Sequence, residues 1–186
     1  MIYINDDIET LDMASAMARI SEQRREKVML IRNEHDRKLS VAAYMLLCDA
    51  LETEYGVTVP PVFDYHEGGK PFIADRRNIC FNISHCRNGV ACAVSNRPVG
   101  IDIETIRPYR HELAERIMNA EEMATIETSP RPDIEFIRLW TMKESFLKMT
   151  GMGIRSDLKQ VPLSSAHFTT TINTARGYIC TACEMT

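Results

Sequence analysis

The sequence predicts an α+β fold built from two similar α+β halves. Two observations carry this prediction. Apolar residues recur at helical spacing over residues 33–55 and 133–150, and short strand patterns cluster after each of these helical parts. The order of helices followed by strands therefore occurs twice, although loosely. Hydrophobic residues make up 45% of the 186 residues, so the chain can bury a sizeable core.

The first third of the chain is expected to be mainly helical. Residues 1–5 are predicted to form a short strand, and residues 8–31 two helical pieces, the second capped by Ser21. A long helix then runs from an Asn33 cap to Gly56, because glycine suits the left-handed position that ends a helix.

Short strands are expected in the middle of the chain. Residues 62–67 and 71–74 flank Gly68-Gly69, which predicts a hairpin. Three further strands follow closely, over residues 79–84, 90–95 and 99–106. Because turn-forming residues separate them, we expect an antiparallel meander.

The C-terminal part is expected to alternate helices with a last hairpin. Its elements are an acid-rich helical segment at 113–127, a helix from an Asp133 cap to Gly151, and strands at 169–173 and 178–182 around Arg176-Gly177.

Composition argues against several classes of protein. A net charge of −4 and a pI near 5.8 disfavour general nucleic-acid binding. No apolar run approaches the ~20 residues of a membrane helix, and the acidic first residues do not look like a signal peptide. The six cysteines lack disulfide-scaffold spacing, and the lone Cys180/Cys183 pair is expected to pack in the core. We therefore expect a cytoplasmic protein with reduced thiols and neither nucleic-acid nor membrane partners.

One predicted helix carries an acid and a base on the same face. Glu144 and Lys148 are four residues apart, beside the apolar Trp140. Such a pair either forms an ion pair on the helix or binds a ligand that needs both an anionic and a cationic partner.

One predicted strand carries two acids on one face. Asp102 and Glu104 alternate with isoleucines in a strand that should be central in the meander. With Glu144 they would supply the oxygen ligands of a hard divalent cation such as Mg²⁺, which in turn would hold a phosphate. The alternative is a solvated strand face and an ordinary ion pair on the helix.

Further residues could bind an anion. Ser84-His85 ends a strand and could donate to a phosphate, and Lys70 follows the glycine-rich turn. A basic cluster comprises Arg24, Arg25, Lys27, Arg32, Arg37 and Lys38. The alternatives are a histidine bonded to a turn carbonyl, an exposed hairpin lysine and a helix laced with ion pairs.

Three motifs, in this order, resemble the 4′-phosphopantetheinyl transferase superfamily, and most closely its larger Sfp-type branch. They are Asn82-Ile83-Ser84-His85, Gly100-Ile101-Asp102-Ile103-Glu104 and Trp140-Thr141-Met142-Lys143-Glu144-Ser145-Phe146-Leu147-Lys148. The segments Arg24-Arg25-Glu26-Lys27 and Gly69-Lys70-Pro71 also match family positions. The resemblance implies a pseudo-dimer of halves 1–98 and 99–186. The active site would lie in the cleft between them, and the second half would carry the metal-ligand motifs.

The resemblance also implies an activity. The enzyme would transfer the 4′-phosphopantetheine arm of coenzyme A to a serine of an apo acyl or peptidyl carrier protein, releasing adenosine 3′,5′-bisphosphate. It would be a holo-[acyl-carrier-protein] synthase and a monomer, with Mg²⁺ as cofactor and Mn²⁺ as a substitute. Fatty-acid, polyketide and peptide synthesis carriers all fit.

The resemblance assigns roles to individual residues. Asp102, Glu104 and Glu144 would be the metal ligands, and Lys148 would contact the pyrophosphate. From the chemistry of transfer, Glu144 could be a metal ligand or, directly or through a water, the base that takes the serine proton. The nucleotide and its 3′-phosphate would be held by Arg24, Lys27, Lys70, Ser84 and His85.

The chain departs from the family at two places. Met152 stands where a lysine is frequent, and Leu39 stands near a position that is often basic. Either Arg37 or Lys38 would then contact the nucleotide.

Two other classes of function remain open at this point. A metal-dependent nuclease would also use acids and a lysine, but the acidic pI and the helical spacing of Glu144 and Lys148 count against it. A non-catalytic protein that binds coenzyme A or a carrier would not need three acids.

Overall fold

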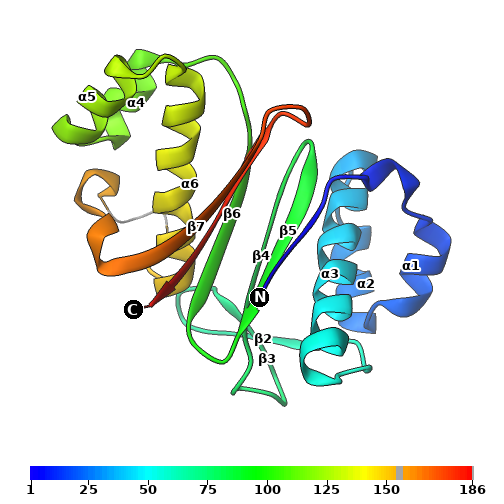
Figure 1. Cartoon of the computed structure of the whole chain (residues 1–186). Coiled ribbons are helices and arrows are strands. Elements are labelled where there is room, and N and C mark those ends of the chain that lie inside the picture. Colours follow the sequence, from blue (N-terminus) through cyan, green and yellow to red (C-terminus); the bar gives the residue numbers. More distant parts are fainter. Residues whose placement is uncertain (154–156, 186) are drawn as a thin grey trace.

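Two three-stranded antiparallel sheets lie side by side between two groups of helices (Figure 1). This computed structural model describes residues 1–153 and 157–185. The first sheet has the strand order β1-β5-β4 and the second has the order β6-β8-β7. Helix α3 packs against the first sheet and helix α6 against the second. The predicted mixture of helices and sheets is confirmed.

The N-terminal elements begin where side chains can cap them. They are β1 (Ile2–Asn5), η1 (Ile8–Thr10), α1 (Met13–Arg19), α2 (Glu22–Met29) and α3 (Glu34–Tyr55). The side chains of Asp12, Ser21 and Asn33 each accept a hydrogen bond from the first turn of the helix that follows. Gly56 ends α3 with a φ of 65°. The predicted caps at Ser21 and Asn33 and the stop at Gly56 are therefore confirmed.

The middle of the chain differs from the predicted meander. Its strands are β2 (Phe63–Tyr65), β3 (Pro71–Ile73), β4 (Cys80–Cys86), β5 (Gly89–Ser95) and β6 (Val99–Thr105). The hairpins β2-β3 and β4-β5 form as expected, but β6 pairs with β8. The meander prediction is wrong at β6, because β1 already occupies the free edge of β5. Strand β6 is consequently an edge strand of its sheet and not a central one.

The C-terminal elements match the prediction with one correction. They are α4 (His111–Ile117), α5 (Ala120–Thr128), α6 (Pro132–Thr150), η2 (Leu158–Gln160), η3 (Leu163–Ser165), β7 (Ala166–Asn173) and β8 (Tyr178–Met185). Helix α6 ends at Gly151 as predicted, but Arg131, not Asp133, occupies its N-cap position. Pro132 sets the start of the helix, and the Asp133 carboxylate bonds to Arg131 instead of to the helix backbone.

The core has several clusters that follow the two sheets. Tyr44, Leu47 and Phe81 are fully or almost fully buried between α3 and the first sheet. Ile137 and Ile179 are buried between α6 and the second sheet. All six cysteines are free thiols, and both Cys180 and Cys183 are buried as expected. Within residues 1–153 and 157–185, no helix is long and apolar enough to span a membrane.

Candidate active site

Helix α6 lies directly against β6, and Gly100 makes this close approach possible. A Cβ atom at Gly100 would lie 1.9 Å from the carbonyl oxygen of Ser145 and 2.5 Å from the backbone nitrogen of Met149. No other residue type can avoid this clash without moving the helix. The packing places Glu144 and Lys148 of α6 beside Asp102 of β6.

Lys148 pairs with Asp102 and with Ser84. Its Nζ donates to Asp102 Oδ1 at 2.6 Å and to Ser84 Oγ at 2.9 Å. Ser84 Oγ donates in turn to Asp102 Oδ1 at 3.0 Å. The ion pair of Lys148 thus crosses from α6 to β6. The same-helix pair with Glu144 is not among the ion pairs of the described residues.

Two carboxylate oxygens at this place are buried and have no hydrogen-bond partner among the described residues. They are Asp102 Oδ2 and Glu144 Oε1. Glu104 has weak partners, since its Oε1 accepts from Trp140 Nε1 at 3.4 Å and its Oε2 from Arg107 Nη2 at 3.5 Å. Buried carboxylate oxygens without partners are costly. The two oxygens are therefore suited to receive a cation or a hydrogen-bond donor from a ligand.

The three carboxylates act on one another electrostatically. Burial raises the pKa of Glu144, and the charges of Asp102 and Glu104 raise it further, while Lys148 lowers it. Burial and then Asp102 likewise raise the pKa of Glu104. Among the described residues, however, no group of three or more histidine, cysteine or acidic side chains is arranged so that it could hold a metal ion.

The basic residues of α2 lie against aromatic rings. Arg24 donates through Nη2 to Ser40 Oγ at 2.6 Å and to the Ser40 carbonyl at 2.9 Å, while its buried Nε has no partner. The Nζ of Lys27 bonds to the Tyr65 hydroxyl and lies 4.1 Å from the centroid of that ring. Burial lowers the pKa of Arg24.

His85 lies on β4 next to Ser84, and its side chain is exposed. Partial burial lowers the pKa of its imidazole, and the nearby charges of Lys148 and Arg24 lower it further, while Asp36 raises it.

Lys70 ties the β2-β3 hairpin to the C-terminal half. Its Nζ donates to the carbonyl oxygens of Met149, at 2.7 Å, and Val99, at 3.1 Å, and burial lowers its pKa. At the hairpin tip, a Cβ on Gly68 would lie 2.6 Å from the Gly151 carbonyl oxygen. An ammonium has three N–H donors, so one remains for a ligand.

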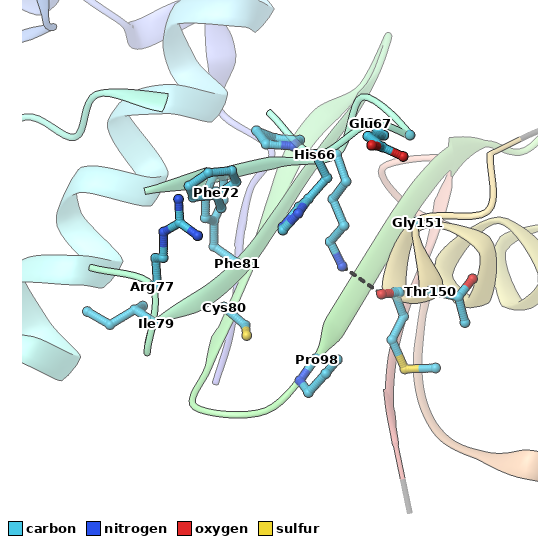
Figure 2. A pocket seen from close by; sticks show the side chains of 14 residues that line it. His66, Glu67, Phe72, Arg77, Ile79, Cys80, Phe81, Pro98, Thr150 and Gly151 are labelled. Carbon is cyan, nitrogen blue, oxygen red and sulfur yellow. Dashed lines mark hydrogen bonds between the residues drawn. The ribbon is translucent and has the colours of Figure 1, made fainter. Parts of the chain in front are cut away.

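Two cavities adjoin this hairpin and share Lys70 and Gly151 in their linings. The smaller, of about 270 Å³, is lined by Asn82, Glu144 and Lys148, so it is the one that reaches Glu144. The larger, of about 580 Å³, lies around Phe72 and Pro98 (Figure 2).

The remaining basic candidates have partners within the protein. Arg37 donates to the Ile31 carbonyl at 2.7 Å, and Lys38 donates to the Glu9 carbonyl at 2.9 Å. Leu39 is buried, whereas Met152 is 60% exposed.

The sequence interpretation gave no role to Asn82. Its Oδ1 accepts a hydrogen bond of 2.9 Å from the backbone nitrogen of Ile101, next to Asp102. A signal was present, since Asn82 shares a strand face with Ser84.

Glu144 and Lys148 of α6 line one cavity together with Lys70 and Asn82, and Lys148 also bonds to Asp102 of β6, an arrangement suited to a phosphorylated ligand. Residues 98–183 match the model of the 4′-phosphopantetheinyl transferase superfamily.

Known proteins are similar over most of the chain. A 4′-phosphopantetheinyl transferase of Bacillus subtilis is 32% identical over 157 residues, which are 82% of this chain and 70% of that protein. The 4′-phosphopantetheinyl transferase Sfp of Bacillus subtilis strain 168 is 31% identical over the same shares. The 4′-phosphopantetheinyl transferase HetI of a Nostoc strain is 38% identical over 65% of this chain and 54% of that protein.

The chain belongs to the 4′-phosphopantetheinyl transferase superfamily and is of the Sfp type. It is accordingly an enzyme that transfers phosphopantetheine to carrier proteins.

Proposed function

We propose that this enzyme moves the 4′-phosphopantetheine arm of coenzyme A to a serine of an apo acyl or peptidyl carrier protein and releases adenosine 3′,5′-bisphosphate. The observation that carries the proposal is the pair of buried, unpartnered oxygens of Asp102 and Glu144 beside Lys148. Glu144 and Lys148 line a cavity that also contains Lys70, and Asp102 bonds to Lys148 beside it. Such a site needs a ligand that brings both positive and negative charge.

A magnesium ion with a pyrophosphate would meet that need. The unpartnered oxygens and the mutual repulsion of Asp102, Glu104 and Glu144 fit a cation. Mg²⁺ keeps several waters and needs only one or two carboxylates beside substrate phosphates. As the described residues stand, the three carboxylates are not arranged around one ion, so we propose that they become its ligands when the ion binds together with the pyrophosphate, with Mn²⁺ as a substitute. The ion would supply stabilisation of the charge on the phosphate oxygens.

The protein's own groups would act around that charge. Lys148 would exchange its contact with Asp102 for one with the pyrophosphate and stabilise the negative charge that grows during transfer. Glu144 has a pKa raised by burial, which suits a base that takes the proton of the carrier serine directly or through a water. His85, Arg24 and Lys27 would hold the nucleotide and its 3′-phosphate, with Lys70 beside them and Ser84 fixing Lys148 and Asp102.

The two-half organisation is part of the proposal. Residues 1–98 contain the first sheet and residues 99–186 the second, so the residues of the site come from both. We propose a monomeric pseudo-dimer whose active site lies between the halves. The cytoplasmic location and the lack of nucleic-acid and membrane partners remain predictions from the sequence.

The test is a transfer assay with coenzyme A, Mg²⁺ and several purified apo carrier proteins. Mass spectrometry should show the gain of one phosphopantetheine on a carrier serine, and excess chelator should abolish it. Asp102→Ala should lose most of the activity, whereas Asp49→Ala, on the exposed surface of α3, should not.

Other outcomes would point to other functions. Binding of coenzyme A without any transfer to the carriers would indicate a non-catalytic binding protein. Cleavage of a nucleic acid in the same buffer would indicate a nuclease. Full transfer in Asp102→Ala or in the presence of chelator would refute the metal site.

A further inference from the structure

The two sheets meet at β4 and β6 without a backbone ladder between them. In the described part of the chain, β4 pairs only with β5, and β6 only with β8. The facing edge of β6 nevertheless contains buried backbone N–H groups, since Ile101 is 0% and Ile103 1% exposed. A buried N–H group without an acceptor destabilises the fold, because it loses its hydrogen bond to water.

Side chains of β4 take the place of the missing ladder. Asn82 Oδ1 accepts from the backbone nitrogen of Ile101 at 2.9 Å, and Ser84 Oγ accepts from that of Ile103 at 3.4 Å. These two acceptors hold the residues on either side of Asp102. The position of Asp102 on β6 is therefore set from β4, which belongs to the other sheet.

Asn82 makes the shorter of these two contacts, and its oxygen has fewer other partners than the oxygen of Ser84. Ser84 Oγ also bonds to Lys148 and Asp102, so its hydroxyl serves several groups. Asn82 Oδ1 has only the Ile101 contact among the bonds of the described residues. Because Oδ1 must accept, the orientation of the amide is fixed. The residue is 7% exposed and lines the smaller cavity together with Glu144 and Lys148.

We propose that Asn82 is a positioning residue of the transfer reaction, which holds Asp102 in place through the backbone N–H of Ile101. This inference rests on the proposed function, because it gives Asp102 a part in transfer. A small displacement of a reacting or ligating group can cost up to about 10²-fold in rate. The contact should thus affect turnover more than its modest energy suggests.

The experiment compares Asn82→Ala with Asn82→Asp. The alanine removes the acceptor, whereas the aspartate keeps an oxygen at the same distance from Ile101. We expect kcat to fall about 10–100-fold in Asn82→Ala and to recover most of that loss in Asn82→Asp. Should Asn82→Ala not fold, Asn82→Ser, whose oxygen is one bond too short, replaces it.

A second readout does not depend on activity. Hydrogen exchange of the Ile101 amide, measured without metal or coenzyme A, should be faster in Asn82→Ala than in the wild type and in Asn82→Asp. Asn82→Ala should change the affinity for coenzyme A, relative to the wild type, less when chelator is present than when Mg²⁺ is present.

Asn88→Ala is the matched control. Asn88 also joins the two halves through its side chain, donating to the Arg176 carbonyl at 2.7 Å. It lies in the β4-β5 turn and not among the site residues. We expect this variant to lose stability and keep its kcat.

The outcomes separate this inference from the proposed function. A wild type that modifies no carrier refutes the function. An active wild type with an unchanged kcat in Asn82→Ala refutes the positioning role. Equal kcat losses in Asn82→Ala and Asn88→Ala would show that Asn82 only joins the halves. A failed rescue by Asn82→Asp, together with unchanged exchange of the Ile101 amide in Asn82→Ala, would show that the acceptor oxygen is not what matters.

Discussion

At the scale of single residues, the candidate site contains a buried charge that lowers stability and is proposed to serve catalysis. Glu144 is 8% exposed, its Oε1 has no partner, and the charge of Asp102 acts on it. Lys148, by contrast, neutralises the buried Asp102. The two residues should therefore act in opposite directions on stability and in the same direction on turnover.

Glu144→Gln is expected to abolish transfer and to raise the melting temperature of the metal-free protein at neutral pH. The neutral amide removes the buried repulsion with Asp102, and a gain of 1 kcal/mol would raise Tm by about 2–4 °C. Thermal unfolding and the carrier assay test both parts. A variant with normal turnover would exclude Glu144 as base or ligand.

Lys148→Met should lower both the stability and the turnover of the enzyme. The methionine keeps the apolar stem but leaves Asp102 as an unpaired, buried carboxylate, which costs about 1–3 kcal/mol. Turnover should fall by about 10²–10³ if the lysine stabilises charge in the transition state. A destabilised variant with normal turnover per folded molecule would mean that Lys148 is only structural.

His85 should couple coenzyme A binding to pH. In the free protein partial burial and then Lys148 lower its pKa, which favours the neutral ring. A bound phosphate would raise that pKa again, so binding takes up a proton, and affinity increases as the pH falls towards the lowered pKa of the free protein. Calorimetry in buffers of different ionisation enthalpy measures the uptake. Equal uptake in the wild type and in His85→Gln would contradict this role.

At the scale of secondary-structure elements, the contact of α6 with β6 determines the geometry of the site. Two residues without side chains make such contacts possible: Gly100 between α6 and β6, and Gly68 between the hairpin and the end of α6. At both positions the missing Cβ leaves room for a neighbouring backbone. Neither glycine has a positive φ.

Gly100→Ala should destabilise the protein strongly. The added Cβ would lie 1.9 Å from the Ser145 carbonyl oxygen, so α6 must move, and overpacking of this kind costs about 1–3 kcal/mol or more. Because α6 carries Glu144 and Lys148, turnover of the folded fraction should fall too. Chemical denaturation and the carrier assay measure the two effects.

Gly69→Ala serves as the control for this substitution. Gly69 has a φ of 80° but no atom within 4 Å of an added Cβ, so it tests backbone strain alone. A Gly100→Ala variant no less stable than Gly69→Ala would contradict the close packing of α6.

At the scale of the whole molecule, contacts between distant segments join the two halves. Lys70 bonds to the Met149 carbonyl, Asn88 to the Arg176 carbonyl, and Tyr178 through its hydroxyl to Asp6 Oδ2 at 3.1 Å. These contacts lie at both ends of the sheets. Neither half should therefore unfold without the other.

We expect a single cooperative unfolding transition. Trp140, the single tryptophan of the chain, lies on α6 and reports on the second half by fluorescence, whereas far-ultraviolet circular dichroism reports on all helices. The two signals should give the same midpoint in urea. Different midpoints would show that the halves unfold separately.

Much of the fold and of the site follows from local sequence rules. Ser21 and Asn33 cap helices because their side chains reach the backbone of the next turn, and Gly56 and Gly151 end helices because they adopt a positive φ. The placing of Asp102 and Glu104 on one strand and of Glu144 and Lys148 on one helix is equally local. The sequence by itself therefore determined the elements, the motifs and the family.

Only the tertiary structure decided which of these elements meet. Strand β1, at the start of the chain, pairs with the edge of β5 that β6 was expected to use. Strand β6 therefore pairs with β8. Lys148 bonds to Asp102, and Asn82 holds Ile101, across gaps of 46 and 19 residues. Such contacts depend on how whole sheets and helices pack, and no spacing along the chain encodes them directly.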